Sequence, residues 1–316
     1  MNWNQKDQNT YDAARASIAW CELPALGKIA VRGADRFSWL QGMISNDVRL
    51  LERGAPSLQA YTLDATGHIL AEITLVSMTE PEPFLLLLVA RDNVKSLYSL
   101  LDRLLIMEDV ELEDVSEAYA VLSLQGAKAE PRAAFGVWIA ADHMGSGGWD
   151  CLGTPASIAA LKSALVAEEI PVISNEVREV LRLEAGIPAY PQELNSQIIA
   201  TEANNASTHI CLTKGCYVGQ EILARIDSRG HTNRALTCLR LTSLPELSAE
   251  IRLLESETGR DVGWITSLVP FAPATQSPLA LGYVRHEKRE AGTLLQMSAG
   301  GTAEVIPIPI YHENAC

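Results

Sequence analysis

The sequence predicts an α+β protein that ends in a small β-barrel, and two observations lead to this fold class. Before about residue 230, segments that alternate like β-strands are mixed with segments whose apolar residues recur at helical spacing. Beyond Arg234 the helical periodicity disappears, and short alternating runs are separated by Gly and Pro turns. We therefore expect hairpin-rich α/β layers first and an all-β unit last.

The first predicted elements are a strand over residues 28–32 and a helix that follows Gly33. The apolar residues at helical spacing in this helix are Phe37, Leu40, Ile44 and Val48. Residues 60–78 form two alternating runs joined by a turn at residues 65–68, which predicts a hairpin. Residues 84–90 give a further apolar strand.

Capping residues and prolines mark the helices further along the chain. Asp92 and Asn175 are placed to cap two helices, and Thr154 followed by Pro155 starts another that ends before Pro171. The remaining predicted strands cover residues 110–115, 119–124, 235–241, 252–255, 261–268, 280–284 and 302–308.

With 316 residues the chain is long for a single core, which predicts two or three closely packed domains. The polar start of the chain indicates a flexible tail over residues 1–16. We expect residues 17–230 to hold two intertwined α/β subdomains and residues 231–316 to form the barrel.

The composition predicts a folded cytoplasmic protein with no membrane segment. The longest apolar run, residues 84–90, is far shorter than the roughly 20 residues that a bilayer-spanning helix needs, and no signal peptide is evident. With 39 acidic and 25 basic side chains, the net charge of −14 disfavours direct, non-specific nucleic-acid binding. The six cysteines lack C-x-x-C spacing, as expected in a reducing compartment; they are Cys21, Cys151, Cys211, Cys216, Cys238 and Cys316.

The most distinctive segment is residues 209–226, in which Gly215 and Gly219 bracket Cys216 just ahead of a predicted helix. A helix N-terminus favours a thiolate, and Lys214 adds a positive charge in the same turn. One interpretation is therefore a reactive Cys216 with a lowered pKa, and the other is a buried packing cysteine.

Other familiar site patterns are missing from the sequence. Cys211, Cys216 and His209 do not have the spacing of a closed zinc site, so we predict no metal site. Residues 145–148 are glycine-rich but lack the lysine and the strand-turn-helix context of a phosphate loop, and a hairpin turn explains them. Dinucleotide, esterase and zinc-protease motifs are also missing.

Two carboxylates are candidates for a ligand site. Glu184 lies between apolar residues near the end of a predicted helix, so it is either an interior carboxylate that needs donors or a surface residue paired to Arg182 or Arg178. Glu72 lies in an apolar strand and is either buried or directed into a pocket. The turn residues beside it, Asp64 and His68, are explained by a solvated hairpin.

The block from Lys214 to Glu221 has the pattern K-G-C-Y-x-G-Q-E, and with it the chain resembles the YgfZ family. Supporting blocks occur in the same order over nearly the whole chain, at residues 33–48, 63–75, 181–190, 262–267 and 280–285. The resemblance implies the fold of the related glycine-cleavage T-protein, an aminomethyltransferase, in which ferredoxin-like α/β subdomains and a C-terminal β-barrel form a ring around a tetrahydrofolate pocket.

The resemblance also implies a function and a set of site residues. It implies a folate-binding accessory protein for the synthesis, maintenance or repair of iron-sulfur enzymes, including those that thiolate tRNA. Its partners would be iron-sulfur enzymes or cluster assembly proteins, and its cofactor tetrahydrofolate or a derivative. Cys216 and Lys214 are the implied catalytic residues, and the implied or candidate cofactor contacts are Glu184, Glu72, Tyr217, Gln220 and Arg225.

Two departures from related patterns bear on this interpretation. Ala71-Glu72 stands where the T-protein has an Asp-Asp pair, which argues against aminomethyl transfer by the T-protein mechanism. Ala200 and Leu212 stand where YgfZ proteins more often have a proline and a phenylalanine. The alternatives are a true aminomethyltransferase of glycine cleavage and a non-catalytic module that docks iron-sulfur enzymes.

Overall fold

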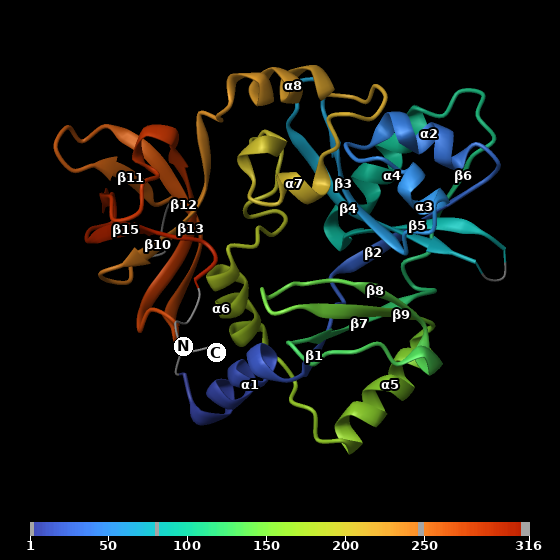
Figure 1. The fold of residues 1–316 in the computed structure, drawn as a ribbon, viewed down its shortest axis with the longest axis horizontal. Helices are drawn as coiled ribbons and strands as arrows, with labels where there is room; N and C mark the ends of the chain where they lie inside the picture. Colours follow the sequence, from blue (N-terminus) through green and yellow to red (C-terminus); the bar gives the residue numbers. More distant parts are fainter. Residues whose placement is uncertain (1–2, 80–81, 246–249, 311–316) are drawn as a thin grey trace.

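A computed structural model describes residues 3–79, 82–245 and 250–310 of the chain. It contains two antiparallel sheets and a closed six-stranded barrel, arranged as lobes around the middle of the molecule (Figure 1). The expected α+β fold with a C-terminal barrel is confirmed.

The larger sheet has five strands in the order β3-β4-β5-β2-β6. These are β2 (Leu26–Arg32), β3 (Ser57–Leu63), β4 (Ile69–Met78), β5 (Phe84–Ala90) and β6 (Glu111–Asp114). The associated helices are α2 (Arg36–Met43), α3 (Arg49–Glu52) and α4 (Val94–Arg103), with the 3₁₀ turn η1 (Arg91–Asn93) before α4. The central strand β5 is buried on both faces, which explains its continuous apolar sequence.

The smaller sheet has four strands in the order β1-β7-β9-β8. These are β1 (Ala19–Glu22), β7 (Ala120–Gln125), β8 (Val137–Ala140) and β9 (Gly148–Gly153), with η2 (Ala133–Phe135) before β8. Helix α5 (Pro155–Ala167) begins at the predicted cap, because the Thr154 side chain accepts a hydrogen bond from the Ser157 N–H.

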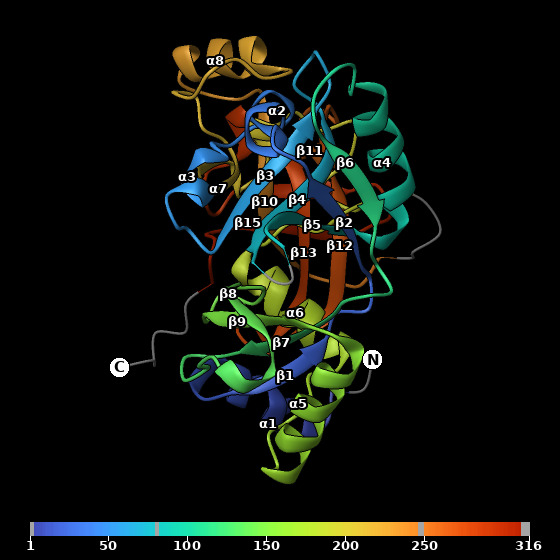
Figure 2. The same cartoon turned by 90° about the vertical axis from the view of Figure 1, so that its right-hand side faces the viewer.

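The two sheets pack face to face between outer helices. Side chains of β5 that point to one side contact α2 and α4, and those on the other side contact the four-stranded sheet. Helix α5 covers the far face of the smaller sheet. Figure 2 shows the five-stranded sheet stacked above the four-stranded one.

Helix α6 (Asn175–Ala185) lies in the middle of the molecule, between the smaller sheet and the barrel (Figure 1). It shares a core with α1 (Gln5–Ala16) and with the barrel. Three short elements follow it: η3 (Ala200–Glu202), α7 (Ala206–His209) and α8 (Gln220–Arg229).

The barrel closes in the order β10-β13-β12-β11-β14-β15 around its own core. Its strands are β10 (Arg234–Leu241), β11 (Arg252–Glu255), β12 (Asp261–Ala272), β13 (Ser277–Arg285), β14 (Leu294–Met297) and β15 (Thr302–Ile306), with η4 (His286–Lys288) after β13. Closure leaves no strand of the barrel without two neighbours, which removes exposed sheet edges. The sequence prediction missed the short strand β14.

The prediction of a flexible tail over residues 1–16 is wrong for the described part of that segment. Residues 5–16 form helix α1, whose Asn4 caps the first turn in a capping box with Asp7. Tyr11 and Ala14 are buried against the core. The helix was not predicted because its residues are mostly polar and only one narrow face of it is buried.

Three smaller predictions of helix ends were also inaccurate. The helix after Gly33 ends at Met43, so Ile44 lies beyond it, in an extended conformation. Ser174, not Asn175, caps α6, and Asp92 lies within η1 rather than capping α4. Such shifts arise because neighbouring polar residues are all good caps and tertiary packing selects among them.

Candidate functional site

The loop that contains Cys216 is held against the connection between α2 and α3. Lys214 is buried, and its Nζ donates hydrogen bonds of 2.7 Å to the carbonyl oxygens of Ile44 and Asn46. Burial lowers the pKa of Lys214 to about 8. The ammonium group that was predicted to activate Cys216 is therefore engaged with main-chain carbonyls of a neighbouring segment.

Cys216 itself is exposed and lies just ahead of α8. In the described part of the chain its sulfur has no hydrogen bond or ion pair. Gly219 turns the chain into α8 with φ of 83°, and a Cβ at this position would come within 2.6 Å of the Asp64 carbonyl oxygen. A glycine is therefore required for the loop to approach the β3–β4 turn.

The remaining residues of the K-G-C-Y-x-G-Q-E block support the loop or lie on the surface. Tyr217 is buried in the central core. Gln220 Nε2 lies 3.5 Å from the carbonyl oxygens of Leu212 and Lys214, across the loop. Arg225 forms an exposed ion pair of 2.9 Å with Glu221 on α8. The block thus builds a fixed loop that presents Cys216 to solvent.

Glu184 is completely buried in α6, and its carboxylate is bonded to protein groups. Its Oε2 accepts a hydrogen bond of 2.7 Å from the Tyr11 hydroxyl and forms an ion pair with Arg15. Its Oε1 accepts from the Ala274 N–H over 3.0 Å. Glu184 therefore joins α1, α6 and the β12–β13 turn, whereas the family resemblance implied contact with the folate cofactor.

Glu72 belongs to a polar network built by β3, β4, the N-cap of α7 and the last residue of α7. Its Oε1 accepts a hydrogen bond of 3.0 Å from Asn205 Nδ2 and lies 3.1 Å from His209 Nε2. Tyr61 donates its hydroxyl hydrogen to Asn205 Oδ1 and stacks on His209 with ring centroids 4.7 Å apart. Burial, with the Glu72 carboxylate nearby, raises the pKa of Tyr61 well above its usual range.

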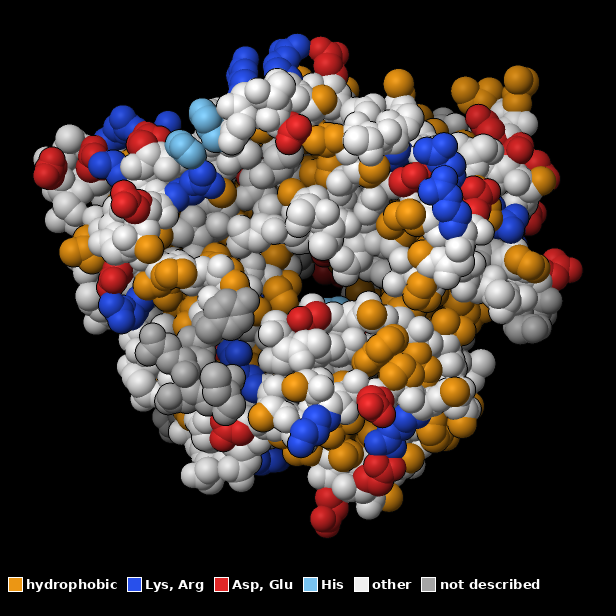
Figure 3. Space-filling view, in the orientation of Figure 1, with side chains coloured by type: hydrophobic (Ala, Val, Ile, Leu, Met, Phe, Trp, Pro, Cys, Tyr) orange, Lys and Arg blue, Asp and Glu red, His pale blue; other side chains and the backbone are white. Residues whose placement is uncertain are grey.

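His143, in the β8–β9 connection, brings the smaller sheet to this region. Its Nε2 lies 2.9 Å from Asp150 Oδ2. Burial acts to lower the pKa of His143. The carboxylates of Asp150, Asp142 and Glu72 act in the opposite direction and outweigh burial, so the net pKa lies above the ordinary histidine value. Figure 3 shows a hollow between the lobes, near the middle of the molecule.

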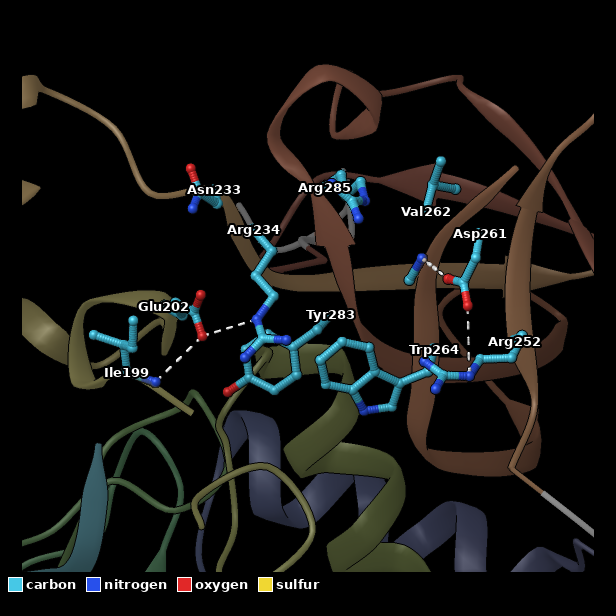
Figure 4. A pocket seen from close by; sticks show the side chains of 11 residues that line it. Ile199, Glu202, Asn233, Arg234, Arg252, Asp261, Val262, Trp264, Tyr283 and Arg285 are labelled. Carbon is cyan, nitrogen blue, oxygen red and sulfur yellow. Dashed lines mark hydrogen bonds and ion pairs between the residues drawn. The ribbon is translucent and has the colours of Figure 1, made fainter. Parts of the chain in front are cut away.

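A separate cavity of about 520 Å³ lies between η3 and the barrel (Figure 4). Trp264 and Tyr283 give it an aromatic wall, with ring centroids 5.3 Å apart. Its polar lining combines cationic and anionic groups. The lining residues are Ile199, Glu202, Asn233, Arg234, Arg252, Asp261, Val262, Gly263, Trp264, Tyr283 and Arg285.

Arg234 organises the cavity. Its guanidinium lies 4.7 Å from the Trp264 ring and donates from Nε to Glu202 over 2.9 Å, as Figure 4 shows. Glu202 also accepts from the Ile199 N–H over 3.2 Å. Burial raises the pKa of Glu202 despite the neighbouring Arg234. On the far side of the cavity, Arg252 pairs with Asp261 at 3.6 Å.

The cavity and the Cys216 loop are connected through η3. The Ala200 N–H donates to the Gly67 carbonyl over 3.0 Å, which joins η3 to the β3–β4 turn. Leu223 of α8 also packs at Gly67, since a Cβ there would meet its side chain at 3.1 Å. The cavity wall, the hairpin turn and α8 therefore form one contiguous unit.

Sequence reasoning missed Trp264, Tyr283, Arg234 and Glu202 as candidate site residues. The sequence did indicate two of them, because Trp264 and Tyr283 lie in the segments 262–267 and 280–285 that resemble the YgfZ family. Arg234 and Glu202 carried no signal, since their pairing depends on how η3 meets the barrel. Within residues 3–79, 82–245 and 250–310, no three His, Cys, Asp or Glu side chains are grouped to hold a metal ion.

The helices in the part of the chain that the structure describes are all too short or too polar to cross a membrane. This finding agrees with the apolar runs of the sequence, none of which has the length of a membrane span.

Comparison with known proteins relates the chain to the glycine-cleavage T-proteins. Residues 1–133 match the family model described as the GCVT N-terminal domain. An aminomethyltransferase of Saccharopolyspora erythraea is 27% identical, with 98% of this chain and 91% of that protein aligned. An aminomethyltransferase of Listeria monocytogenes is 25% identical over 95% of this chain and 88% of that protein. An uncharacterized protein of Haemophilus influenzae is 28% identical over 76% of this chain and 81% of that protein.

The fold is that of a solved T-protein. The crystal structure of glycine cleavage system aminomethyltransferase T from Bartonella henselae matches with a TM-score of 0.79, covering 96% of this chain and 89% of that chain at 19% identity. The chain therefore has the T-protein fold, and its sequence is similar to those of these aminomethyltransferases over nearly its whole length.

Proposed function

We propose that this chain binds tetrahydrofolate or a derivative and acts as an accessory protein of the YgfZ type in the synthesis, maintenance or repair of iron-sulfur enzymes. The observation that supports folate binding best is the cavity of about 520 Å³ between η3 and the barrel. Its size falls in the range usual for small-molecule sites, and its lining is aromatic and charged.

The chemistry of the lining fits a reduced folate. Such a molecule combines flat or nearly flat rings with N–H donors at one end and glutamate carboxylates at the other. Trp264, with the fully buried Tyr283 ring beside it, offers a ring face, and Glu202 offers its second carboxylate oxygen to N–H donors. Arg252 and Arg285 offer guanidinium groups to carboxylates. These are the residues that would hold the ligand, whose reduced ring nitrogens supply the one-carbon chemistry of folates.

The choice of accessory role over aminomethyl transfer depends on Glu72 and Cys216. Ala71-Glu72 stands where the T-protein has its Asp-Asp pair, and the Glu72 carboxylate already contacts Asn205 and His209. Cys216 is presented to solvent by a fixed loop, where a partner protein can reach it. The resemblance of that loop to the YgfZ block supports the proposed role with iron-sulfur enzymes, including those that thiolate tRNA.

Calorimetry tests the folate proposal. We expect tetrahydrofolate to bind the native chain, and Arg234→Ala to weaken binding at least tenfold, because the guanidinium that orders Glu202 and covers Trp264 is lost. Arg240→Ala is the matched control, since Arg240 pairs with Glu304 elsewhere on the barrel. Absence of heat with the native protein would remove the proposal.

A complementation experiment tests the accessory role. In a strain that lacks this protein, we expect Cys216→Ala to reduce the activity of iron-sulfur enzymes, while Cys151→Ala, a buried cysteine on β9, serves as the control for loss of any thiol. Full activity with Cys216→Ala would instead favour the non-catalytic docking module.

The second candidate function is aminomethyl transfer in glycine cleavage. The similarity to aminomethyltransferases over nearly the whole chain favours it. Assay with the other components of the glycine cleavage system distinguishes the two functions. We expect no turnover above background, and substantial turnover would overturn the accessory role.

A further inference from the structure

The connection between α4 and β6, residues 104–109, presents two adjacent apolar side chains to solvent. Ile106 and Met107 are 85% and 92% exposed, and Leu104 beside them is 39% exposed. In the described part of the chain, the next most exposed large apolar side chain is Leu294 at 59%. Single exposed apolar residues are ordinary on protein surfaces, but a group of neighbouring ones is typical of an interaction site.

Hydrogen bonds fix the backbone that carries this apolar pair. Glu108 Oε2 accepts from the N–H groups of Ile106 and Met107 over 3.0 and 3.1 Å. These bonds lower the pKa of Glu108, so its carboxylate is ionised and bonded at neutral pH. The Leu105 side chain packs against the core of the five-stranded sheet. The apolar pair is therefore presented by a structured loop.

The loop is also anchored to the turn that begins α2. The Asp35 N–H donates to the Asp109 carbonyl over 3.1 Å, and the Asp109 N–H donates to Asp35 Oδ2 over 2.9 Å. The Ala34 N–H donates to Asp109 Oδ2 over 3.1 Å. Gly33, with φ of 93°, permits this approach, because a Cβ there would lie 2.0 Å from the Asp109 carbonyl oxygen. A loop held in this way loses little further freedom on binding.

The surroundings of the apolar pair are strongly acidic. Residues 102–114 contain one cation, Arg103, and six carboxylates: Asp102, Glu108, Asp109, Glu111, Glu113 and Asp114. Among these carboxylates only Glu113 forms an ion pair within the described residues, with Arg32 at 3.7 Å. Figure 3 shows hydrophobic side chains beside Asp and Glu at the upper right corner, where Figure 1 places α2 and β6. A partner that covers the apolar pair therefore meets negative charge around it.

This charge distinguishes three kinds of partner. A second copy of the chain would bring the same carboxylates and its own net charge of −14, which opposes self-association. An anionic membrane surface would be repelled for the same reason. A protein with an apolar pocket rimmed by Lys and Arg would gain both from apolar burial and from charge attraction.

We propose that the loop of residues 104–109 is a docking site for a protein partner whose surface carries an apolar pocket with a rim of Lys and Arg. Ile106 and Met107 enter this pocket, and the carboxylates around them face the basic rim. The unbranched side chain of Met107 adapts to the shape of the pocket. The identity of the partner, an iron-sulfur enzyme or a cluster assembly protein, rests on the proposed function.

The docking site and the Cys216 loop are supported from opposite ends of α2. Residues 33–35 hold the docking loop before the helix, and residues 44–46 hold the Cys216 loop after it. The eight residues of α2 span about 12 Å. A standard protein interface covers about 800 Å² of each partner, an area roughly 30 Å across. A single partner can therefore contact the docking site and reach Cys216.

Photocrosslinking in cells tests the docking site. The photoreactive residue p-benzoylphenylalanine is placed in the full chain at position 107 or, as the control, at position 166 on α5, where Val166 is also exposed. We expect a protein to crosslink to position 107 and not to position 166, through a peptide that borders an apolar pocket flanked by Lys and Arg. The proposal is overturned by equal crosslinking at both positions, or by crosslinks to a second copy, to lipid or to a surface without such a pocket.

Affinity measurements with the purified crosslinked protein test the two contributions separately. Ile106→Ser combined with Met107→Ser should weaken binding by about tenfold or more, whereas Val166→Ser should not change it. Glu111→Lys and higher salt concentration should each weaken binding, because both reduce the attraction to a basic rim. Affinity that is independent of salt, or unchanged in the double variant, contradicts the proposal.

Complementation separates failure of the docking site from failure of the proposed function. We expect the double variant of Ile106 and Met107 to lower iron-sulfur enzyme activity while tetrahydrofolate binding and thermal melting stay unchanged. If Cys216→Ala lowers this activity and the double variant does not, the docking site is wrong and the accessory role stands. If neither lowers it, the accessory role fails, and the affinity for the crosslinked protein decides the docking site.

Discussion

At the scale of single residues, Lys214 shows how a buried cation is stabilised without a carboxylate partner. Its ammonium donates to two main-chain carbonyls and lies 5.0 Å from the Tyr217 ring. These contacts replace water, yet burial still lowers its pKa to about 8. Lys214 therefore serves as a clamp between the loop and residues 44–46.

Replacing Lys214 by Met should destabilise the protein by about 1–3 kcal/mol, because two buried carbonyl groups lose their donor. Between pH 8 and 10 the unfolded chain holds a lysine proton that the native chain has released, so native stability relative to the variant should increase with pH. Urea denaturation at several pH values measures both effects. Lys95→Met on the exposed face of α4 is the control, and an equal loss in both variants would contradict the clamp.

At the scale of elements, helix α1 completes the core that α6 begins. Without it, Glu184 would keep its hydrogen bond from the Ala274 N–H but lose its only described cation. The helix is therefore part of the folded unit, although its composition is polar.

Replacing Arg15 by Met should cost about 3–5 kcal/mol, because it leaves the buried Glu184 carboxylate without a charged partner. Arg32→Met removes a more exposed ion pair, with Glu113 at 3.7 Å, and should change stability by less than about 1 kcal/mol. Denaturation midpoints of the two variants measure the contrast, and similar midpoints would rule out a structural role for the α1–α6 pair.

At the scale of the whole molecule, the barrel and the two sheets meet around α6, and the proposed ligand cavity lies where η3 contacts the barrel. A ligand there binds the folded arrangement but not the unfolded chain. We expect tetrahydrofolate at a hundred times its dissociation constant to stabilise the native protein by about 2.7 kcal/mol. Thermal melts should show this shift for Arg240→Ala but a smaller one for Arg234→Ala.

The His143–Asp150 pair, which joins the β8–β9 connection to β9, predicts a pH dependence of stability. The pKa of His143 is raised in the native state, so the stabilisation is fully present below the unfolded value of about 6.5 and is lost as pH rises through the native pKa. The stability difference between the native protein and His143→Gln should therefore be larger at pH 5.5 than at pH 8.5. Denaturation at the two pH values measures it, with His231→Gln as control, and a difference that grows with pH would contradict the pairing.

The sequence by itself determined much of the fold, because local pattern was sufficient for it. Alternation identified the strand at residues 84–90, and Thr154-Pro155 identified the start of α5. The loss of helical periodicity after Arg234 predicted the barrel. Only tertiary structure decided the partners of the polar groups. Lys214 binds carbonyls of residues 44 and 46, and Glu184 binds residues of α1. Such pairings join residues distant in the chain, and no local pattern carries that information.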